Sequence, residues 1–367
     1  MKVVFSSNIS WSIYNFRRSL LNSLQSEGHT IHAVASRDDY SEKLVEENFI
    51  YHEIKINNNS TNPVEDVKLI IQYYKIYKKI NPDVICHNAI KPNIYGTIAA
   101  KLLGIPVVNN ISGLGTLFIK KSFSTSIAKF LYKVSQRRAD KVFFQNPTDF
   151  REFKENKLIK PERCEVIPGS GVDTDTFVPN KNQRKGPFQF IFIGRLIFDK
   201  GIREYIEALR ILKQKNSDIE GAILGPIYHS NKTAITQEDL DNWIKEGIIN
   251  YLGETDHVVD FMQKADCLVL PSYREGLSKV LIEGSSVGLP IVTTDVPGCR
   301  DVVVDKETGY LSRVKDGKDL AGKMQWILDL SDSDRKKMGE KARERAVNTF
   351  DNKIIIKQYK DAIYGVA

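Results

Sequence analysis

The sequence contains 367 residues, of which 41% are hydrophobic and 27% charged, with a formal net charge of +7 at pH 7. This composition excludes an intrinsically disordered chain, and the length favours two domains over a single core. No apolar run approaches the roughly 18–20 residues that a membrane-spanning helix requires, so we expect a globular protein without such a helix.

The start of the chain and its cysteines both bear on the cellular compartment. Residues 1–7 lead directly into an expected strand and lack the layout of a signal peptide. The cysteines are far apart and form no CxxC pair, which is typical of reduced thiols; they are Cys86, Cys164, Cys267 and Cys299. We therefore expect a cytoplasmic protein.

The first half alternates short β-branched runs with helical periods, a pattern typical of an α/β domain with a parallel sheet. Gly28 and Gly104 stand where glycine commonly ends a helix. We expect strands near residues 2–6, 30–35, 50–53, 84–88, 107–111, 141–145 and 165–167, with helices between them.

Positive charge is concentrated in this half. Residues 1–180 contain 24 Lys and Arg against 18 Asp and Glu, and no acidic residue lies between Asp83 and Asp140. We therefore expect one face of the first domain to be cationic. Nothing here resembles a basic, aromatic-interleaved motif for nucleic acid.

The end of this acid-free interval predicts an amphipathic helix. An apolar stripe at helical spacing contains Phe123, Ile127, Phe130, Leu131 and Val134. Basic residues follow another face or come just before the helix: Lys120, Lys121, Lys129, Lys133 and Arg137. Two interpretations remain open, an ordinary domain helix with a solvated side and a contact with an anionic membrane surface. The missing acidic residues favour the membrane contact.

A second series of elements follows a stretch rich in Pro and Gly at 161–189, which has the composition of a linker. Strands are expected near 188–193, 221–224, 249–252, 268–271, 291–294 and 310–311, and helices near 318–328, 332–348 and 352–364. We expect two doubly wound α/β domains, 1–178 and 179–351, facing across a cleft. The helix at the end of the chain would pack back on the first domain. Ligands of such domains bind at the carboxyl ends of the strands.

The strand at 188–193 runs into Gly194 and two cations, Arg195 and Lys200. A planar guanidinium and a compact ammonium beside a glycine turn suit a phosphate group. The alternative interpretation is that Arg195 and Lys200 are ordinary solvated surface residues. The motif described next favours the phosphate site.

Glu275 and Glu283 flank an apolar run that follows the expected strand at 267–272. The first acid would lie in a strand-to-helix loop, and the second two turns into the helix. Such a loop aims free N–H groups and a helix dipole at one spot, which favours phosphate, while the carboxylates accept hydrogen bonds from hydroxyl groups. Hydroxyls that flank phosphates are typical of a sugar nucleotide. A loop acid and an exposed helix acid are the alternative, but the apolar residues before Glu283 predict that it is buried.

Together, Arg195 with Lys200 and the Glu-x7-Glu pattern resemble the retaining glycosyltransferases of family 4, which have the GT-B fold. The resemblance covers the whole chain. Residues 167–177 resemble the interdomain segment of that family. Residues 90–96 and 112–115 resemble its bacterial branch for capsule, O-antigen and lipid-linked oligosaccharide assembly, which includes N-acetylgalactosaminyltransferases.

The resemblance implies a role for each matching residue. Arg195 and Lys200 would neutralise the diphosphate of a UDP-sugar, Glu283 would bind the ribose hydroxyls, and Glu275 the transferred sugar. Further donor contacts would come from Gly194, Gly276, Leu277 and Ser278. The resemblance implies no metal cofactor, so the Asp173-Thr-Asp175 segment is interpreted as structural.

The resemblance also implies an acceptor, a saccharide linked to a polyprenyl diphosphate at the inner face of the cytoplasmic membrane. Where many members carry a histidine this chain has His87, and its first loop lacks their double glycine. Contacts to acceptor or donor sugar are expected from Asn8, Ser10, His87, Asn88, Lys91, Gly113 and Gly115. Two alternatives share the nucleotide site: a UDP-GlcNAc epimerase of the same fold, and a sugar-nucleotide-binding protein without activity.

Overall fold

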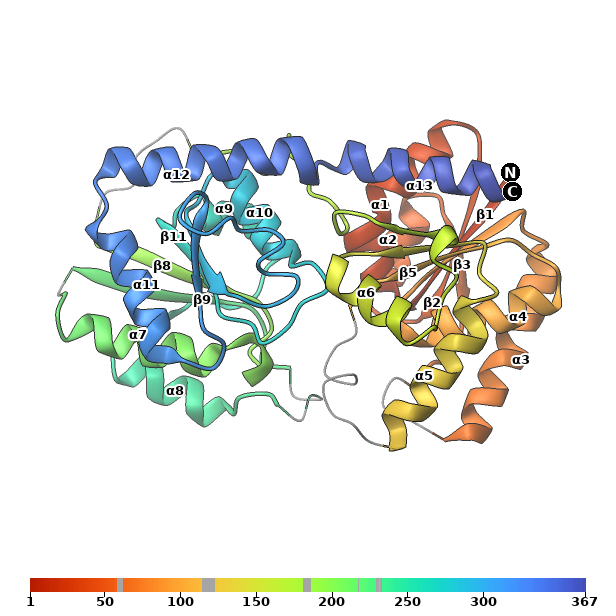
Figure 1. Ribbon diagram of the computed structural model, residues 1–367, viewed down its shortest axis with the longest axis horizontal. Helices are drawn as coiled ribbons and strands as arrows, with labels where there is room; N and C mark the ends of the chain where they lie inside the picture. Colours follow the sequence, from red (N-terminus) through yellow and green to blue (C-terminus); the bar gives the residue numbers. More distant parts are fainter. Residues whose placement is uncertain (58–61, 114–122, 181–185, 217, 229–230, 232) are drawn as a thin grey trace. The chain divides into compact units, whose positions relative to one another are not determined.

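A computed structural model describes residues 1–57, 62–113, 123–180, 186–216, 218–228, 231 and 233–367. The chain forms an N-terminal unit, Met1–Gly171 with Asn352–Ala367, and a C-terminal unit, Val172–Asp351 (Figure 1). The boundary lies at Gly171 rather than at residue 178, because the next residues are bonded to the C-terminal unit. The Val172 N–H donates to the Phe350 carbonyl (2.9 Å), and Arg343 donates to the Phe177 carbonyl (2.6 Å).

The N-terminal unit is built on a parallel sheet with the strand order β3-β2-β1-β4-β5-β6-β7. Its core strands are buried on both faces, as expected for a sheet covered on both sides. The strands are β1 (Lys2–Ile9), β2 (Thr30–Ser36), β3 (Ile50–Glu53), β4 (Val84–Asn88), β5 (Val107–Ile111), β6 (Lys141–Phe144) and β7 (Cys164–Val166).

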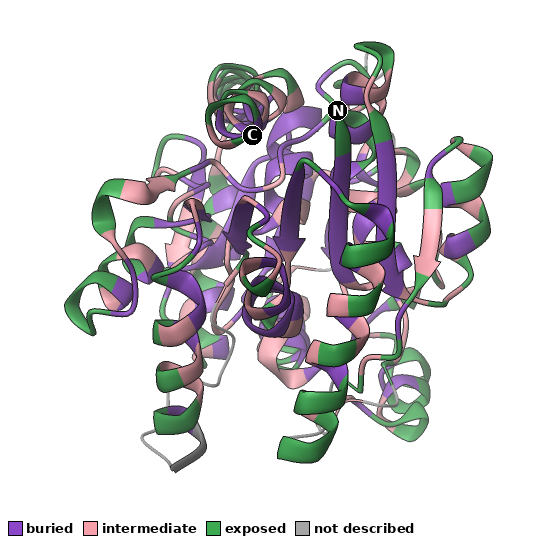
Figure 2. Cartoon of the chain, turned by 90° about the vertical axis from the view of Figure 1, so that its right-hand side faces the viewer, coloured by how far each residue is buried: buried purple, intermediate pink, exposed green. Residues whose placement is uncertain are grey.

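Helices cover both faces of this sheet. One face packs against α1 (Ser10–Ser26) and α13 (Asn352–Val366), and the other against α3 (Pro63–Ile80), α4 (Thr97–Leu102) and α5 (Phe123–Gln136). Figure 2 shows buried strands between helices whose outer sides are exposed. The remaining elements are α2 (Tyr40–Glu46), α6 (Pro147–Glu155), the π-helix η1 (Pro92–Gly96) and the 3₁₀ turn η3 (Pro161–Arg163).

Local sequence signals explain where these helices begin and end. At the start of α3, Pro63 occupies the first turn and the Asn62 side chain accepts a hydrogen bond from the Val64 N–H (2.9 Å). Gly28 and Gly104, predicted as terminating residues, have φ of 85° and 73°, the left-handed conformation that ends a helix.

The end of the chain returns to the N-terminal unit. Helix α13 lies beside α1, and Ile355, Tyr359 and Ile363 are buried in the same apolar cluster as the strands (Figure 1). These three residues recur at helical spacing and form the buried face of α13.

The C-terminal unit is also built on a parallel sheet, with the order β10-β9-β8-β11-β12-β13. The strands are β8 (Phe188–Ile193), β9 (Ile219–Leu224), β10 (Asn250–Tyr251), β11 (Cys267–Leu270), β12 (Ile291–Thr294) and β13 (Gly309–Ser312). Since β8 and β11 are neighbours, the loops that follow them meet at one edge of the sheet. The predicted doubly wound architecture is confirmed in both units.

The helices of this unit surround one large apolar cluster. They are α7 (Ile202–Lys213), α8 (Gln237–Lys245), α9 (Val258–Met262), α10 (Lys279–Val287), α11 (Gly317–Asp329) and α12 (Asp332–Arg345), with η4 (Phe198–Lys200) and η5 (Ala346–Phe350). Within the described residues, none of the helices has the length and apolar character needed to cross a membrane.

Candidate functional site

The turn after β8 carries the two predicted cations. Gly194 has a φ of 155°, and its N–H donates to the Leu224 carbonyl (3.0 Å). Arg195 is exposed, and its guanidinium carbon lies 5.2 Å from the centre of the Tyr228 ring. The face of the Tyr228 ring, in the segment after β9, therefore holds the Arg195 guanidinium in place. The Arg195 side chain remains exposed.

Lys200 ends η4 and is followed by Gly201, which has a left-handed φ of 76°. A Cβ atom at residue 201 would lie 2.6 Å from the carbonyl carbon of Pro271, just after β11. Only glycine allows the backbones to approach this closely. The sequence thereby brings Lys200 against the loop that carries Glu275.

Lys200 and Glu275 form an ion pair between the two loops. The Ser272 hydroxyl donates to the same carboxylate oxygen, Oε1, over 2.7 Å. The side chains of Lys200 and Glu275 are only 19% and 13% exposed, so water screens their attraction incompletely. One ammonium, one carboxylate and one hydroxyl are thus fixed at the carboxyl ends of two adjacent strands.

The loop after β12 forms hydrogen bonds with the loop that carries Glu275. The Glu275 N–H donates to the Pro297 carbonyl (3.1 Å), and the Ser278 N–H to the Gly298 carbonyl (3.0 Å). Gly298 has a φ of 79°, and a Cβ atom there would lie 2.6 Å from the carbonyl carbon of Glu275. A side chain at residue 298 would therefore displace the loop that carries Glu275.

Helix α10 begins directly after the loop that carries Glu275. The Ser278 side chain makes no capping hydrogen bond, and the first turn contains no acidic residue, so the positive end of the helix dipole is not neutralised from within the helix. Glu283 lies in the second turn and is 8% exposed, as the apolar residues before it predicted. Burial raises the pKa of its carboxyl, and the ion pair with Lys279 (3.5 Å) opposes that rise.

These groups can bind a diphosphate that is flanked by hydroxyls. A helix N-terminus and Lys200 attract phosphate oxygens. When a phosphate replaces Glu275 as the partner of Lys200, the Glu275 carboxylate can accept hydrogen bonds from hydroxyl groups. Glu283 offers a second carboxylate in the second turn of α10. Arg195 is on the neighbouring turn and contacts Tyr228 instead of the acid pair.

The Asp173–Asp175 segment forms a turn. Asp173 accepts hydrogen bonds from the N–H groups of Asp175 (3.0 Å) and Thr176 (3.1 Å), and from the Thr176 hydroxyl (2.7 Å). Its carboxylate oxygens therefore serve the turn, as the structural interpretation of this segment requires. Within the part of the chain that the structure describes, no group of three or more His, Cys, Asp or Glu side chains is arranged to hold a metal ion.

The N-terminal candidates are distributed over the carboxyl ends of several strands. Asn8 is the second-last residue of β1, and its Oδ1 atom is buried without a hydrogen-bond partner among the described residues. Lys91 forms an ion pair with Asp66 of α3 (3.1 Å). Ser10 is fully buried and its hydroxyl contacts the Ser41 hydroxyl (2.9 Å), so it stabilises the start of α1. A substrate contact at Ser10 stays a prediction.

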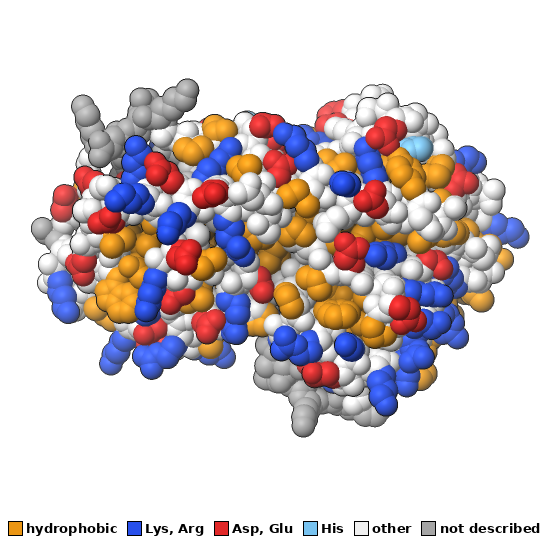
Figure 3. All heavy atoms as spheres, turned by 45° about the horizontal axis from the view of Figure 1, so that its top comes forward, with side chains coloured by type: hydrophobic (Ala, Val, Ile, Leu, Met, Phe, Trp, Pro, Cys, Tyr) orange, Lys and Arg blue, Asp and Glu red, His pale blue; other side chains and the backbone are white. Residues whose placement is uncertain are grey.

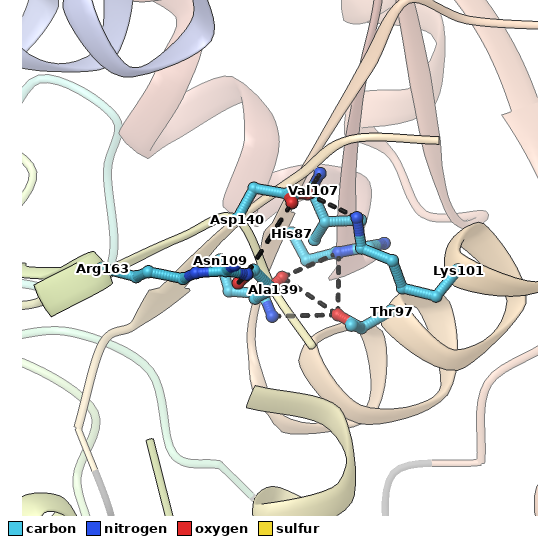
Figure 4. Close-up of polar contacts among 8 residues, drawn as sticks. All are labelled: His87, Thr97, Lys101, Val107, Asn109, Ala139, Asp140 and Arg163. Atoms are coloured by element: carbon cyan, nitrogen blue, oxygen red, sulfur yellow. Dashed lines mark hydrogen bonds and ion pairs between the residues drawn. The ribbon is translucent and has the colours of Figure 1, made fainter. Parts of the chain in front are cut away.

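His87 is also buried. One ring nitrogen lies 2.9 Å from the Tyr77 hydroxyl. The other lies 2.9 Å from Asn109 Oδ1, and Thr97 joins the same network (Figure 4). Burial lowers the pKa of His87 to about 4, so the ring is neutral near pH 7. The histidine joins β4 to β5 and α3, and its contact with a substrate stays a prediction.

Helix α5 turns part of its apolar side outward. Ile127 is 47% and Phe130 is 64% exposed, while the polar Ser135 and Gln136 are buried. Gln136 is drawn inward because its amide donates to the Asn93 carbonyl (2.7 Å) and accepts from Asn109 (2.8 Å). The helix is therefore oriented by buried hydrogen bonds, which leave a hydrophobic stripe at the surface.

The cations of α5 differ in their availability. Lys133 and Arg137 are exposed. Lys129 is instead held by Glu152 (3.5 Å) and Asn156 (2.8 Å) of α6. Figure 3 shows Lys and Arg side chains gathered on the right of the visible face, within the N-terminal unit. Gly113, the last described residue before position 123, has a φ of 133°. The predicted contacts at Gly115, Lys120 and Lys121 lie outside the described residues.

Sequence reasoning missed several groups that organise these sites. Ser272 and Gly298 bond or pack against Glu275, and Tyr228 stacks on Arg195. Of these three residues, only Gly298 had a signal, a Pro-Gly turn after a strand, and nothing in that signal says which loop it supports.

Comparisons with known families match both units. The description "Glycosyl transferases group 1" matches residues 173–345, and "Glycosyl transferase 4-like" matches residues 2–146. The first match covers the strand-to-helix loops described above, and the second covers the N-terminal sheet up to β6.

Two curated relatives are similar along most of the chain. One is the N,N'-diacetylbacillosaminyl-diphospho-undecaprenol alpha-1,3-N-acetylgalactosaminyltransferase of Campylobacter jejuni, 28% identical, over 98% of this chain and 97% of the relative. Another is the UDP-Gal:alpha-D-GlcNAc-diphosphoundecaprenol alpha-1,3-galactosyltransferase of Escherichia coli, 25% identical, over 78% of this chain and 76% of the relative.

Among solved structures, Alr3699/HepE of Anabaena, crystallised with UDP and glucose, has a TM-score of 0.83 at 16% identity, over 99% of each chain. A glycosyltransferase from Rickettsia africae has a TM-score of 0.78 at 18% identity, over 100% of this chain and 98% of the other. At this identity the likeness concerns the fold, and it confirms the GT-B architecture.

The buried His87 makes stability depend on pH. Its folded-state pKa of about 4 lies below the ordinary value of 6.5, so protons bind preferentially to the unfolded chain. The contribution of neutral His87 to the free energy of unfolding is fully present above about pH 6.5. It is lost as the pH falls toward 4, and the loss reaches about 3 kcal/mol. We expect His87→Gln to flatten this part of the pH profile in urea unfolding. The exposed His257, changed to Gln, is the matched control, and equal slopes for both variants would contradict the assignment.

Proposed function

The chain belongs to the group 1 glycosyltransferases, and from that premise we propose that it moves a sugar from a UDP-sugar to a saccharide carried on a polyprenyl diphosphate. The C-terminal unit binds the donor and the N-terminal unit binds the acceptor. The observation that carries the proposal is the Lys200–Glu275 ion pair beside the N-terminus of α10, with Glu283 in the same helix.

The chemistry follows from where charge develops. The bond between the anomeric carbon and the diphosphate breaks, and negative charge grows on the departing UDP. Lys200, Arg195 and the helix dipole stabilise that charge. The acceptor hydroxyl attacks from the same face, the new glycosidic bond forms with retention, and the hydroxyl proton passes to an oxygen of the leaving phosphate.

Each carboxylate has a separate task in this reaction. Glu283 binds the ribose hydroxyls, and Glu275, once its ammonium partner has engaged the diphosphate, binds hydroxyls of the transferred sugar. The backbone of Gly276 and Leu277, with Ser278 and Gly194, completes the contact with the diphosphate. Ser272 keeps the Glu275 carboxylate oriented.

The transferred sugar is an N-acetylhexosamine, for example N-acetylgalactosamine. The name of the Campylobacter relative supports this sugar, and the names of both relatives support an acceptor on diphosphoundecaprenol. The product would enter the assembly of a surface glycan such as an O-antigen or a capsule.

The same reaction requires no metal ion. Diphosphate departure needs positive charge, and two side-chain cations with an uncapped helix N-terminus supply it.

A lipid-linked acceptor places the reaction at the inner face of the cytoplasmic membrane. Helix α5 supports a contact with an anionic leaflet, since it exposes Ile127 and Phe130 together with Lys133 and Arg137. Apolar side chains can enter the interface while each nearby cation adds about 1 kcal/mol.

We expect Arg195→Ala and Glu283→Ala to weaken UDP binding on the order of 10- to 100-fold, because each variant loses charged hydrogen bonds. Isothermal calorimetry with UDP measures the effect. Arg210→Ala is the matched control, an exposed arginine of α7 whose ion pair is with Glu246. Wild-type affinity in the Arg195 and Glu283 variants would remove their proposed roles.

Chelation tests the metal-free reaction. Turnover of a UDP-sugar on a polyprenyl-diphosphate-linked acceptor should be unchanged in excess EDTA, because protein cations carry the leaving-group charge. Loss of turnover that added magnesium or manganese restores would contradict this proposal.

Membrane contact by α5 predicts that Phe130→Asp combined with Lys133→Glu and Arg137→Glu abolishes sedimentation with phosphatidylglycerol vesicles. The apolar side chain and two cations are each lost from the contact. Lys336→Glu with Lys337→Glu on α12 is the control, since both lysines are exposed in the C-terminal unit. Equal binding by both sets would assign α5 to the solvated side of the domain.

A further inference from the structure

Arg17 places a permanent positive charge inside the apolar face of α1. It is 4% exposed and lies in the helix stripe that otherwise buries Ile13, Leu20 and Leu24. A guanidinium stays charged at any physiological pH, so this charge cannot be removed by deprotonation. A buried ion of this kind needs a compensating partner.

The partners that the structure gives Arg17 are neutral. Asn88 Oδ1 accepts from Nε (3.2 Å) and Nη2 (2.9 Å), and the Phe16 carbonyl accepts from Nη1 (2.9 Å). The Tyr359 ring of α13 lies 5.0 Å from the guanidinium carbon. Across the described ranges, no Asp or Glu carboxylate forms an ion pair with Arg17. The positive charge is thus solvated by dipoles, without a counter-charge.

The neighbouring amides add unused hydrogen-bonding capacity. Asn88 turns its oxygen to Arg17, which fixes the direction of its Nδ2 group, and that buried donor has no partner among the described residues. Asn110 is the neighbour of Asn88 across β4 and β5. Its Nδ2 donates to the Tyr359 hydroxyl (2.6 Å), and its Oδ1 has no partner within the same described ranges. If the Tyr359 hydroxyl donates instead, the Asn110 amide turns and offers a second free N–H.

The cluster lies where ligands of parallel sheets bind. Asn88 is the last residue of β4, and open α/β sheets bind ligands at the carboxyl ends of their strands. The next residue, Ala89, has a φ of 76°, a left-handed conformation that is strained for alanine. A cation, a free amide donor and a strained turn therefore coincide at one position.

We propose that Arg17, Asn88 and Asn110 form a phosphate subsite in the N-terminal unit, which binds one phosphoryl group of a diphosphate. The proposal rests on the proposed function for the source of that phosphoryl group. The donor diphosphate and the acceptor diphosphate share this chemistry, and the experiment separates them.

Inorganic pyrophosphate is the first probe. The double variant Arg195→Ala/Lys200→Ala silences the C-terminal phosphate site, and we expect pyrophosphate at constant ionic strength still to raise its melting temperature. Adding Arg17→Met, which keeps the apolar stem and removes the charge, should abolish that shift. Arg18→Met is the matched control, because the adjacent arginine is 48% exposed and lies over Tyr14. An identical shift with Arg17→Met and Arg18→Met would overturn the proposal.

Substrate binding then identifies the source of the phosphoryl group. If it is the acceptor, Arg17→Met should raise the KM for a short-chain prenyl-diphosphate saccharide about tenfold or more and leave UDP affinity unchanged; if it is the donor, UDP affinity should fall by that factor. A lowered melting temperature with both affinities unchanged would make Arg17 a structural residue and overturn the proposal.

Two points keep this test decisive. Should Arg17→Met fail to fold, Arg17→Lys retains the charge without the two-pronged geometry, and Asn88→Ala removes the free donor; each should reduce the pyrophosphate shift. The pyrophosphate measurement needs no sugar transfer. Absence of turnover in the wild type would therefore remove the proposed function and leave the subsite testable.

Discussion

The ion pair between Lys200 and Glu275 is the interaction on which the C-terminal unit is organised. It can form only because two backbone approaches are closer than any side chain would allow, one at Gly201 against Pro271 and the other at Gly298 against Glu275. The sheet order places β8 beside β11, and the two glycines bring the following loops into contact. In the reaction we propose, the cation exchanges its carboxylate partner for a phosphate, and a lysine paired with a single carboxylate can do this with little reorganisation.

The predictable part of this protein lies in patterns whose cause is local. Apolar runs predicted the buried strands, Gly28 and Gly104 predicted helix ends, and the run before Glu283 predicted a buried acid. Residues whose role depends on a distant partner could not be recovered in this way. Nothing around Gly298 in the sequence names Glu275 as its neighbour, and the apolar residues of α5 do not reveal that Gln136 turns them outward. The domain boundary shifted for the same reason, since Val172 is bonded to Phe350, far along the chain.

The N-terminal unit has an unusually polar interior between β4, β5 and the helices that cover them. His87, Asn109 and Gln136 are buried and mutually bonded, and Asn110 reaches the Tyr359 hydroxyl on the opposite face. Buried hydrogen bonds are directional, so they fix how α3, α5 and α13 sit on the sheet in a way that apolar contacts alone would not. That rigidity provides a firm base for the strand ends, where we propose that the acceptor binds.

The return of α13 to the N-terminal unit has a consequence for how the chain is made. During synthesis β1 to β7 precede α13, the helix that covers Phe143 and packs beside α1. The C-terminal unit is continuous in sequence and has all its strands available before that moment. Until α13 has been translated, part of the apolar face of the N-terminal unit therefore stays uncovered. Translation order and folding order are thus opposed in this protein, and the incomplete N-terminal unit is the stage at which a chaperone would have something to bind.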